Sequence, residues 1–513
     1  MRKFCNFRPF VLLAIAVILS TILSVFVVNP VLQMCIFIAL ILFSVASFII
    51  YFVKKYKIFR FLSVFILVFA LPFLTINYQT FKFDSMAGRY ENYQLTVLGR
   101  ISEHYEITRN GYLRIIVEDV ETASGDIIEN INGNIAIYTS KDYIDASNLD
   151  IGCYISAKLE LDFNTISSKD EMELMYLSKN IVAGGFADAD NIVIYNNKDV
   201  ELSDIIKQKV IDTLDASDMK HADVAYAMMF GDTSIVDGNV NTIYQNTGIA
   251  HILAVSGLHV SAIVFVISFI LKKLKVSQKV QIVTLAMLLG FYVYLCSFSI
   301  SVIRSSFMAI ILNYSYIRGK AYDRFSVLAL LAMVILLFSP LELFNVSFVL
   351  SFMSVLSIIL LEQPLSRLFN KVFYNKLASE FGLLFSLQLG ITVVSVYYFN
   401  KLNPLTFLAN LVSIPVVTFA FLSIILFAMI AMIFPFANVV CKFIGEIFAG
   451  VTQFNSYINS LNLGVVTSAI PAFVIPIVFM ILFIISDYCF VSKKIKVGAS
   501  ALAVAGYIIL FFI

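Results

Sequence analysis

Long apolar runs separated by short polar segments occupy most of the chain, apart from one polar interval between residues 79 and 247. A helix needs about 20 apolar residues to cross the hydrocarbon of a bilayer. Thirteen runs come close to that length: 10–28, 31–53, 58–78, 249–271, 279–299, 300–317, 325–340, 343–361, 377–399, 404–434, 438–460, 466–490 and 497–513. Because 300–317, 404–434 and 438–460 are the weakest of these runs, the pattern predicts a polytopic α-helical membrane protein with about 11–13 spans.

The polar interval changes character along its length. From residue 93 to about 195, short alternating runs are separated by Gly, Asn and Asp, a pattern typical of antiparallel strands. The five runs are YQLTVLGRI (93–101), GYLRIIVEDV (111–120), GNIAIYT (133–139), GCYISAKLEL (152–161) and NIVIYN (191–196). We expect these strands to close into a small OB-like β-barrel. The segment SKDEMELMYLSKN (168–180) is predicted to be helical, and from 201 to 247 the periodicity becomes that of amphipathic helices.

This organisation predicts four parts. Residues 1–78 form three N-terminal transmembrane helices, and 79–200 form an extracytoplasmic β domain. Residues 201–247 form amphipathic linker helices, and 248–513 form a transmembrane bundle.

Charged residues are few, and the two signs are segregated. Charged side chains make up 14% of the chain and hydrophobic ones 60%, whereas soluble domains carry about 25% charged residues. The interval 79–247 has 13 basic and 28 acidic residues, a net charge of −15, while the rest of the chain has a net charge of +17. Of the 23 basic residues outside the interval, 20 fall in loops on one side of the predicted membrane. The positive-inside rule therefore predicts a cytoplasmic N terminus and an extracytoplasmic interval.

The fourth apolar run carries a cluster of polar and small residues around the sequence HILAVSGLHV. Gly248, His251, Ser256 and His259 fall within an arc of roughly 140° if the helix is regular, and Gly257 lies off that arc. Since ionisable groups in a span are costly, such side chains face protein or water rather than lipid. One polar residue alone would indicate helix-to-helix hydrogen bonding, whereas four together favour a lined cavity.

Two catalytic alternatives are weaker. Ser256 and His259 have the residue types of a serine hydrolase, but a Ser and a His three apart on one regular helix point outward together and do not face each other. No HExxH pattern, acidic cluster or thiolate accompanies the histidines, so a metal site is not expected. We therefore expect no catalytic residue, metal or cofactor.

Three further polar features lie in apolar runs. Arg304, in SISVIRSSFMAI, costs about 2.5–3.5 kcal/mol if it lies at mid-bilayer. It either forms an ion pair with Asp323 or Glu342, or contacts a phosphate, which suits the guanidinium fork. Asp323 itself lies in a basic loop, where a solvated charge is expected. In NPLTFLANLVSIPVV, Asn410 and Pro415 fall inside a span, where a proline breaks the helix and makes either a packing kink or part of a transport path.

In their order and spacing, these motifs resemble those of the ComEC family of competence proteins, which forms the inner-membrane channel for DNA uptake in transformation. The stretch MMFGDTSIVDGNVNTIYQNTGIAHILAVSGLHVSAI (228–263) is the most specific match. The supporting matches are Arg304 in SVIRSSFM, Asp323 in RGKAYDRFSVLALLAM, SPLELFNVSFVLSFMSVLSI (339–358) and NPLTFLANLVSIPVV (403–417).

The resemblance implies a function, site residues and partners. It implies translocation of single-stranded DNA into the cytoplasm across the inner (cytoplasmic) membrane, with an OB-type outer domain. The residues that would line or brace the DNA path are Gly248, His251, Ser256, Gly257, His259, Arg304 and Asn410, with Asp232, Asp323 and Pro415 in supporting positions. The chain has no Walker A loop, so a motor or a gradient must act from elsewhere. With the resemblance, the expected partners are a cytoplasmic helicase-like ATPase, a membrane-tethered DNA receptor and a separate nuclease, besides the lipid bilayer.

The chain also departs from the family pattern. Val349 stands where the family often has Gln, and Ser305 follows Arg304 where the family often has Ala. Cys153 is the only cysteine in the polar interval, so the disulfide that many members carry there cannot form. No HxHxDH motif of the metallo-β-lactamase-like domain is present, and we expect the chain to have no nuclease activity of its own.

The charge of the polar interval opposes one part of this interpretation. Proteins that bind single strands use basic grooves with stacking aromatic residues. The interval offers aromatics, among them Tyr105, Tyr112, Tyr138 and Tyr154, but its net charge of −15 disfavours tight DNA binding. Either the groove is local or another protein delivers the strand. Two alternative functions stay open: a secondary transporter for a smaller anionic solute, and an intramembrane hydrolase using Ser256.

Overall fold

The computed structural model describes residues 8–27, 29–90, 93–108, 111–124, 127–140, 149, 151–195, 201–319, 322–431, 434–461, 463, 465–466 and 470–510. These residues form two compact units. The first, the sheet unit, comprises Arg8–Ile205 and Ala329–Val346. The second, the bundle unit, comprises Ile206–Leu328 and the chain from Ser347 onward.

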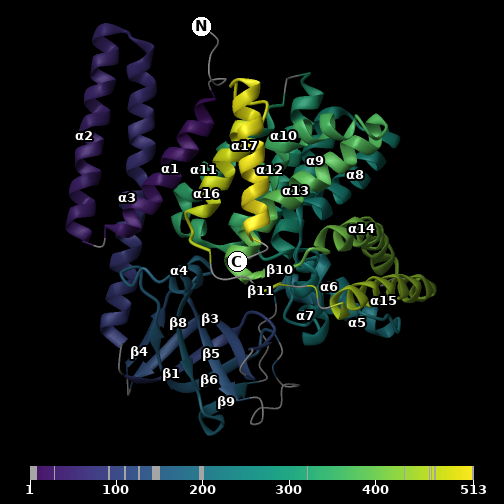
Figure 1. Cartoon of the computed structure of the whole chain (residues 1–513). Helices are drawn as coiled ribbons and strands as arrows, with labels where there is room; N and C mark the ends of the chain where they lie inside the picture. The colour runs from purple at the N-terminus through teal and green to yellow at the C-terminus, as the bar shows by residue number, and fades with distance from the viewer. Residues whose placement is uncertain are drawn as a thin grey trace. The chain divides into compact units, whose positions relative to one another are not determined.

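The sheet unit begins with three long helices, α1 (Pro9–Phe26), α2 (Pro30–Lys54) and α3 (Lys57–Tyr90) (Figure 1). Asn29 caps the N-terminus of helix α2, and its Oδ1 accepts hydrogen bonds from the backbone N–H groups of Val31 and Leu32. Helix α3 packs against both α1 and α2, and the hydroxyls of Ser44 and Ser63 hydrogen-bond across the α2–α3 contact at 3.1 Å. With 34 residues, α3 is about 51 Å long and continues well past residue 78.

The β region of the sheet unit is one mixed sheet, with strands in the order β7-β8-β5-β3-β1-β6-β9. The strands on this path are β1 (Gln94–Ile101), β3 (Tyr112–Ser124), β5 (Asn134–Ser140), β6 (Tyr154–Glu160), β7 (Asp162–Phe163), β8 (Ile181–Phe186) and β9 (Ile192–Tyr195), while β2 (Glu106–Ile107) and β4 (Ile127–Ile131) pair with β3. The end strands β7 and β9 do not pair with each other, so the sheet is open and the predicted closed barrel is not confirmed.

All five predicted strands are present, as β1, β3, β5, β6 and β9, and the predicted helix is α4 (Glu171–Ser178). The pattern missed β8, whose sequence IVAGGF contains two glycines that weaken a strand signal. Gly185 has a packing reason to lack a side chain, because a Cβ atom there would lie 2.3 Å from the carbonyl oxygen of Glu160. Strand β8 also pairs with β5 in parallel, so the sheet is not purely antiparallel.

The bundle unit contains most of the remaining helices. They are α5 (Leu202–Ala216), α6 (Ala222–Phe230), α7 (Gly238–Thr247), η3 (Ala250–Ile252), α8 (Gly257–Lys273), α9 (Gln278–Leu295), α10 (Ile300–Ile317), α12 (Val346–Phe369), α13 (Asn375–Phe399), α14 (Thr406–Ala431), α15 (Asn438–Ser460), α16 (Val474–Ile485) and α17 (Lys493–Leu510). Helix α11 (Arg324–Phe338) runs from the bundle unit into the sheet unit and is followed by η4 (Pro340–Phe344). The largest core of the bundle joins α6, α7, α14 and α15 around the fully buried Tyr226, Tyr244, Phe421 and Phe448.

Nine helical segments among the described residues are long and apolar enough to cross a membrane. They are α1, α2, α3, the segment Ala250–Lys273, α9, α10, α12, α13 and α14, and they fit a multi-pass membrane protein. Four predicted runs fall short: α11 and α16 have only 15 and 12 residues, α15 is interrupted by polar residues, and α17 begins with three lysines. Residues 1–7, including Arg2 and Lys3, and the end of the 497–513 run lie outside the described residues.

Candidate functional site

The polar cluster of the fourth apolar run lies at a break between helices, not on a regular helix. Helix α7 ends at Gly248, which has φ 76° and ψ 19°. A single 3-10 turn, η3, follows, and α8 begins only at Gly257. A Cβ atom on Gly248 would lie 2.5 Å from Cγ2 of Thr406 in α14, so this position requires glycine for both its backbone angle and its packing.

The segment before α14 holds the end of α7 in place. The Asn403 side chain donates a hydrogen bond to the carbonyl oxygen of Asn246 at 2.9 Å, and Lys401 Nζ donates to Asn246 Oδ1 at 2.8 Å. His251 lies in the η3 turn, is half-buried and interacts with the backbone of Gly248. The helix break is therefore part of the packed structure.

Ser256 and His259 form the N-terminal cap of α8. The backbone N–H of Ser256 donates to Nδ1 of His259 at 3.2 Å, and the Ser256 side chain accepts from the backbone N–H of His259, which is a capping box. The imidazole is 2% exposed and packs 4.3 Å from the ring of Phe421. Each side chain therefore bonds to the backbone of the other residue. The regular helix that we assumed over both residues is wrong, because Ser256 precedes α8. The contact satisfies backbone N–H groups and does not place the Ser256 hydroxyl as a donor to Nδ1.

Arg304 packs against the first residue of α8. A Cβ atom on Gly257 would lie 3.2 Å from Nη2 of Arg304. The guanidinium is 4% exposed, donates from Nε to Ser351 Oγ at 2.7 Å and lies 5.9 Å from the centre of the Phe352 ring. Ser351 is further hydrogen-bonded to Ser301 at 3.2 Å. Helices α8, α10 and α12 therefore converge on one cation.

Arg304 forms no salt bridge with any residue that the structure describes. Among the described residues, Arg304 therefore does not form the predicted ion pair with Asp323 or Glu342. Asp323 accepts a hydrogen bond from Ser326 at the start of α11, and Glu342 accepts one from Asn345 at 2.9 Å. With no counter-ion among the described residues, burial of the Arg304 guanidinium has a desolvation cost, which its hydrogen bond to the neutral Ser351 offsets only in part.

Asn410 and Pro415 lie on α14 without breaking it. Asn410 is 8% exposed and donates to Gln388 Oε1 of α13 at 2.9 Å, while its own Oδ1 is buried with no partner among the described residues. Helix α14 continues across Pro415 from Thr406 to Ala431, because one missing backbone hydrogen bond is tolerated in a transmembrane helix. The predicted break at Pro415 is thus wrong, and the break lies between α7 and α8 instead.

The structure brings together only part of the predicted set. Gly257 and Arg304 lie in contact, Ser256 and His259 cap the same helix, and α14 packs against α8 through Phe421. Asp232 accepts from Ser234 in the loop after α6, and neither it nor Asp323 has a described contact with the other site residues. His259 and Arg304 are too buried to face open water in this conformation, so their predicted role in lining a passage stays a prediction.

Sequence reasoning missed the residues that complete the cluster around Arg304 and His259. They are Ser351 and Phe352 of α12, Phe421 and Thr406 of α14, and Gln388 of α13. The serines of SFVLSFMSVLS recur at helical spacing, a signal that could have indicated a polar stripe on α12. The other contacts join helices far apart in the chain and leave no local pattern.

The predicted aromatic residues of the polar interval are only partly grouped. On the sheet, the ring of Phe186 lies 5.3 Å from that of Tyr112 and 5.4 Å from that of Tyr138. Tyr112 and Phe186 are 39% and 65% exposed. Burial, and then the neighbouring Tyr176, raise the pKa of Tyr138. This Tyr112–Phe186–Tyr138 cluster is the exposed aromatic surface that stacking on a base would need.

The fold and this site define a multi-pass membrane protein with a mixed β-sheet and a cation buried at a broken helix. Residues 228–510 match the model of the Competence protein family, and the chain belongs to that family, also known as ComEC/Rec2. The match covers the α7–α8 break, Arg304, Ser351 and Asn410.

Two curated proteins are similar over a shorter region. ComE operon protein 3 of Bacillus subtilis is 28% identical over 200 residues, 39% of this chain and 25% of that protein. Recombination protein 2 of Haemophilus influenzae is 28% identical over 216 residues, 39% of this chain and 27% of that protein. The aligned region thus spans about a quarter of each relative. No solved structure matches.

Proposed function

We propose that this protein is the membrane channel that passes single-stranded DNA into the cytoplasm during competence. The observation that carries the proposal is the buried Arg304 at the start of α8. A helix N-terminus carries a partial positive charge. A guanidinium beside it, with no carboxylate in salt-bridge contact among the described residues, makes a site that an anion such as a phosphodiester would complete.

The described conformation represents a closed state in this proposal. A DNA strand requires a wet route, whereas His259 and Arg304 are 2% and 4% exposed. Opening would separate α8 from α10 and α14. Gly257 contacts Arg304 of α10, and His259 contacts Phe421 of α14. The 3-10 turn and the extended Ser256 between α7 and α8 provide backbone positions where such a change is absorbed.

Partners would supply what the chain's own residues do not offer. We assign the driving force to a cytoplasmic helicase-like ATPase and strand degradation to a separate nuclease, and we propose that the chain itself has no enzymatic activity. A membrane-tethered receptor would deliver the strand, because the outer interval is acidic overall. The Tyr112–Phe186–Tyr138 cluster is the local surface on which bases of the delivered strand would stack.

The deciding experiment compares labelled DNA uptake in the parent strain, a deletion strain and complemented strains. The proposal requires that the deletion abolish entry of DNA into the cytosol while binding at the cell surface persists. Arg304→Gln should fail to restore entry at normal membrane abundance. The matched control is Arg367→Gln, an exposed arginine of the same unit that pairs with Asp487. Normal entry in the deletion strain contradicts the proposal.

A transporter of a smaller anionic solute is the second candidate, because the site at Arg304 holds one cation and is tightly enclosed. The two candidates differ in substrate length. A channel for DNA admits labelled strands of increasing length, whereas a solute transporter excludes all of them and exchanges a small anion in reconstituted vesicles.

A further inference from the structure

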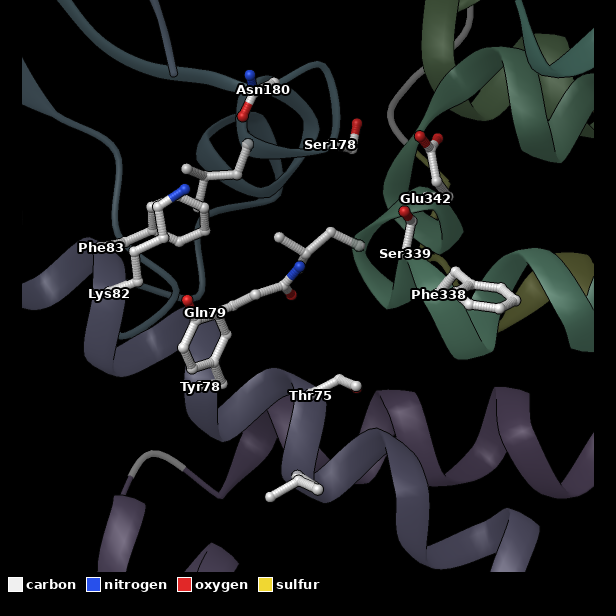
Figure 2. A pocket seen from close by; sticks show the side chains of 13 residues that line it. Thr75, Tyr78, Gln79, Lys82, Phe83, Ser178, Asn180, Phe338, Ser339 and Glu342 are labelled. Carbon is white, nitrogen blue, oxygen red and sulfur yellow. The ribbon is translucent and has the colours of Figure 1, made fainter. Parts of the chain in front are cut away.

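The sheet unit holds a cavity of about 780 Å³ between α3, the end of α4 and the η4 turn. We call it the α3–η4 pocket. Figure 2 shows Lys82 and Gln79 on the α3 side, Glu342 and Ser339 on the η4 side, and Ser178 and Asn180 near the end of α4. All the lining residues belong to the sheet unit.

The pocket lies where α3 leaves the predicted hydrocarbon. No charged residue occurs on α3 between Arg60 and Lys82, and the 21 residues between them rise about 32 Å, close to the roughly 30 Å hydrocarbon thickness of a bilayer. Tyr78 and Phe81 are 67% and 70% exposed, and Phe338 is 83% exposed. A tyrosine such as Tyr78 at that depth is typical of a membrane–water boundary.

The pocket combines an apolar side with two opposite charges. Leu74, Tyr78 and Phe338 form its exposed apolar rim. Lys82 and Glu342 line its interior, and neither forms a salt bridge with any residue that the structure describes. The Lys82 ammonium instead lies 5.3 Å from the centre of the Phe83 ring.

The acceptor groups of the pocket are under-satisfied. Among the described residues, the Glu342 carboxylate accepts one hydrogen bond, from Asn345 Nδ2 at 2.9 Å, and burial raises its pKa to about 7. The Oε1 atom of Gln79 is buried without a partner in the part of the chain that the structure describes, and Figure 2 shows its side chain extending from α3 toward η4. A ligand cation with several N–H donors would serve both groups, and a ligand anion would pair with Lys82.

We propose that the α3–η4 pocket binds a zwitterionic phospholipid with a primary ammonium, of the phosphatidylethanolamine type. The phosphate pairs with Lys82, the ammonium donates to Glu342 and Gln79, and the acyl chains descend along Leu74 and Tyr78 into the bilayer. A headgroup with both charges compensates the two unpaired charges of the pocket at once. An anionic phospholipid would leave the Glu342 side uncompensated. This site is independent of the proposed DNA path.

Native mass spectrometry of the delipidated full-length protein tests the proposal with three lipids of identical acyl chains. Phosphatidylethanolamine should bind about tenfold tighter than phosphatidylglycerol, because only its ammonium forms an ion pair with Glu342. It should also bind tighter than phosphatidylcholine, whose ammonium has no N–H to donate. The ratio of the first two affinities is measured in one sample, so it does not depend on the fraction of protein that is folded. Water-soluble phosphoethanolamine should not compete at equal concentration, because it lacks the acyl chains.

Single substitutions separate the two halves of the pocket. Glu342→Gln should make the affinities for phosphatidylethanolamine and phosphatidylglycerol about equal, with the affinity for phosphatidylglycerol unchanged. Lys82→Met should weaken both lipids about tenfold. Glu121→Gln on β3 and Lys57→Met at the other end of α3 are matched controls and should leave the ratio unchanged. Equal binding of all three lipids, an ethanolamine preference that survives Glu342→Gln, or a preference for phosphatidylglycerol that depends on Lys82 alone overturns the proposal.

Discussion

Gly257 leaves the space that Arg304 occupies: a Cβ atom on Gly257 would lie 3.2 Å from Nη2 of Arg304 and 3.7 Å from Cβ of Ser305. Glycine at the first position of α8 therefore brings a buried cation to the positive end of a helix. That arrangement is electrostatically unfavourable by itself and becomes favourable when an anion joins it. The proposed phosphate contact follows from this pair.

Gly257→Ala should impair DNA uptake more than it impairs folding. The new methyl group must displace the guanidinium by a few tenths of an ångström, and overpacking of this kind costs about 1–3 kcal/mol. We expect uptake to fall about tenfold at equal membrane abundance, measured with labelled DNA. Gly290→Ala in α9 is the control, because no atom of the described residues lies within 4 Å of its new Cβ atom. Equal uptake in the two variants contradicts the role assigned to this contact.

Gly248→Ala should lower stability, because the position has both a positive φ and no space. The left-handed conformation costs a non-glycine residue about 1–2 kcal/mol, and the new methyl group would contact Thr406 at 2.5 Å. We expect a lower unfolding temperature in detergent and less protein in the membrane. Adding Thr406→Ala should recover the part due to crowding but not the part due to φ. If the double variant recovers the unfolding temperature completely, or not at all, the loss of stability does not divide into these two parts.

Substitutions at Asn410 distinguish a structural role, holding α13 against α14, from a role in the proposed DNA path. Asn410→Leu removes the donor to Gln388 Oε1, and an unsatisfied buried acceptor costs about 1–3 kcal/mol. The double variant Asn410→Leu/Gln388→Leu should recover the unfolding temperature. If Asn410 only braces α13 against α14, uptake recovers as well; uptake that stays low in the stable double variant places Asn410 in the path.

The pKa of Glu342 makes a prediction about pH. Burial raises the pKa of Glu342 from its ordinary value of 4.5 to about 7. Between these two pH values the folded protein keeps a proton on Glu342 that the unfolded chain has lost. The contribution of Glu342 to the free energy of unfolding is therefore fully present below pH 4.5 and is lost as the pH rises through about 7. In delipidated protein, Glu342→Gln should raise the unfolding temperature by about 3 °C at pH 8 and by less at pH 5. An equal gain at both pH values contradicts the assigned cause.

The sequence predicted elements better than it predicted contacts. Alternation and turn residues located β1, β3, β5, β6 and β9, because each strand has one buried and one exposed face. Strand β8 was missed because its glycines serve a close approach to Glu160 that only the fold reveals. The openness of the sheet depends on which edges pair, which the strand pattern does not specify.

The candidate site shows the same limit. Its residues Gly248, Ser256, Gly257 and His259 stood out by type, but the regular-helix geometry applied to them was wrong. Hydropathy stays high through the break between α7 and α8, and the capping box pairs Ser256 with a histidine rather than the usual Glu or Gln. The Ser351 partner of Arg304 lies 47 residues away on another helix, and no local pattern predicts such a contact.

The central claim, that the strand passes the start of α8 beside Arg304, is tested most directly by crosslinking DNA halted in transit. A photoreactive phenylalanine analogue is placed at position 352, under the guanidinium, and a strand with a bulky end-block is trapped during uptake. The same analogue at Phe443, an exposed residue of α15, serves as the control. The account predicts a DNA adduct at position 352, lost in the Arg304→Gln background and absent at position 443. An uptake-competent variant that gives no adduct at position 352 while the strand is trapped contradicts it.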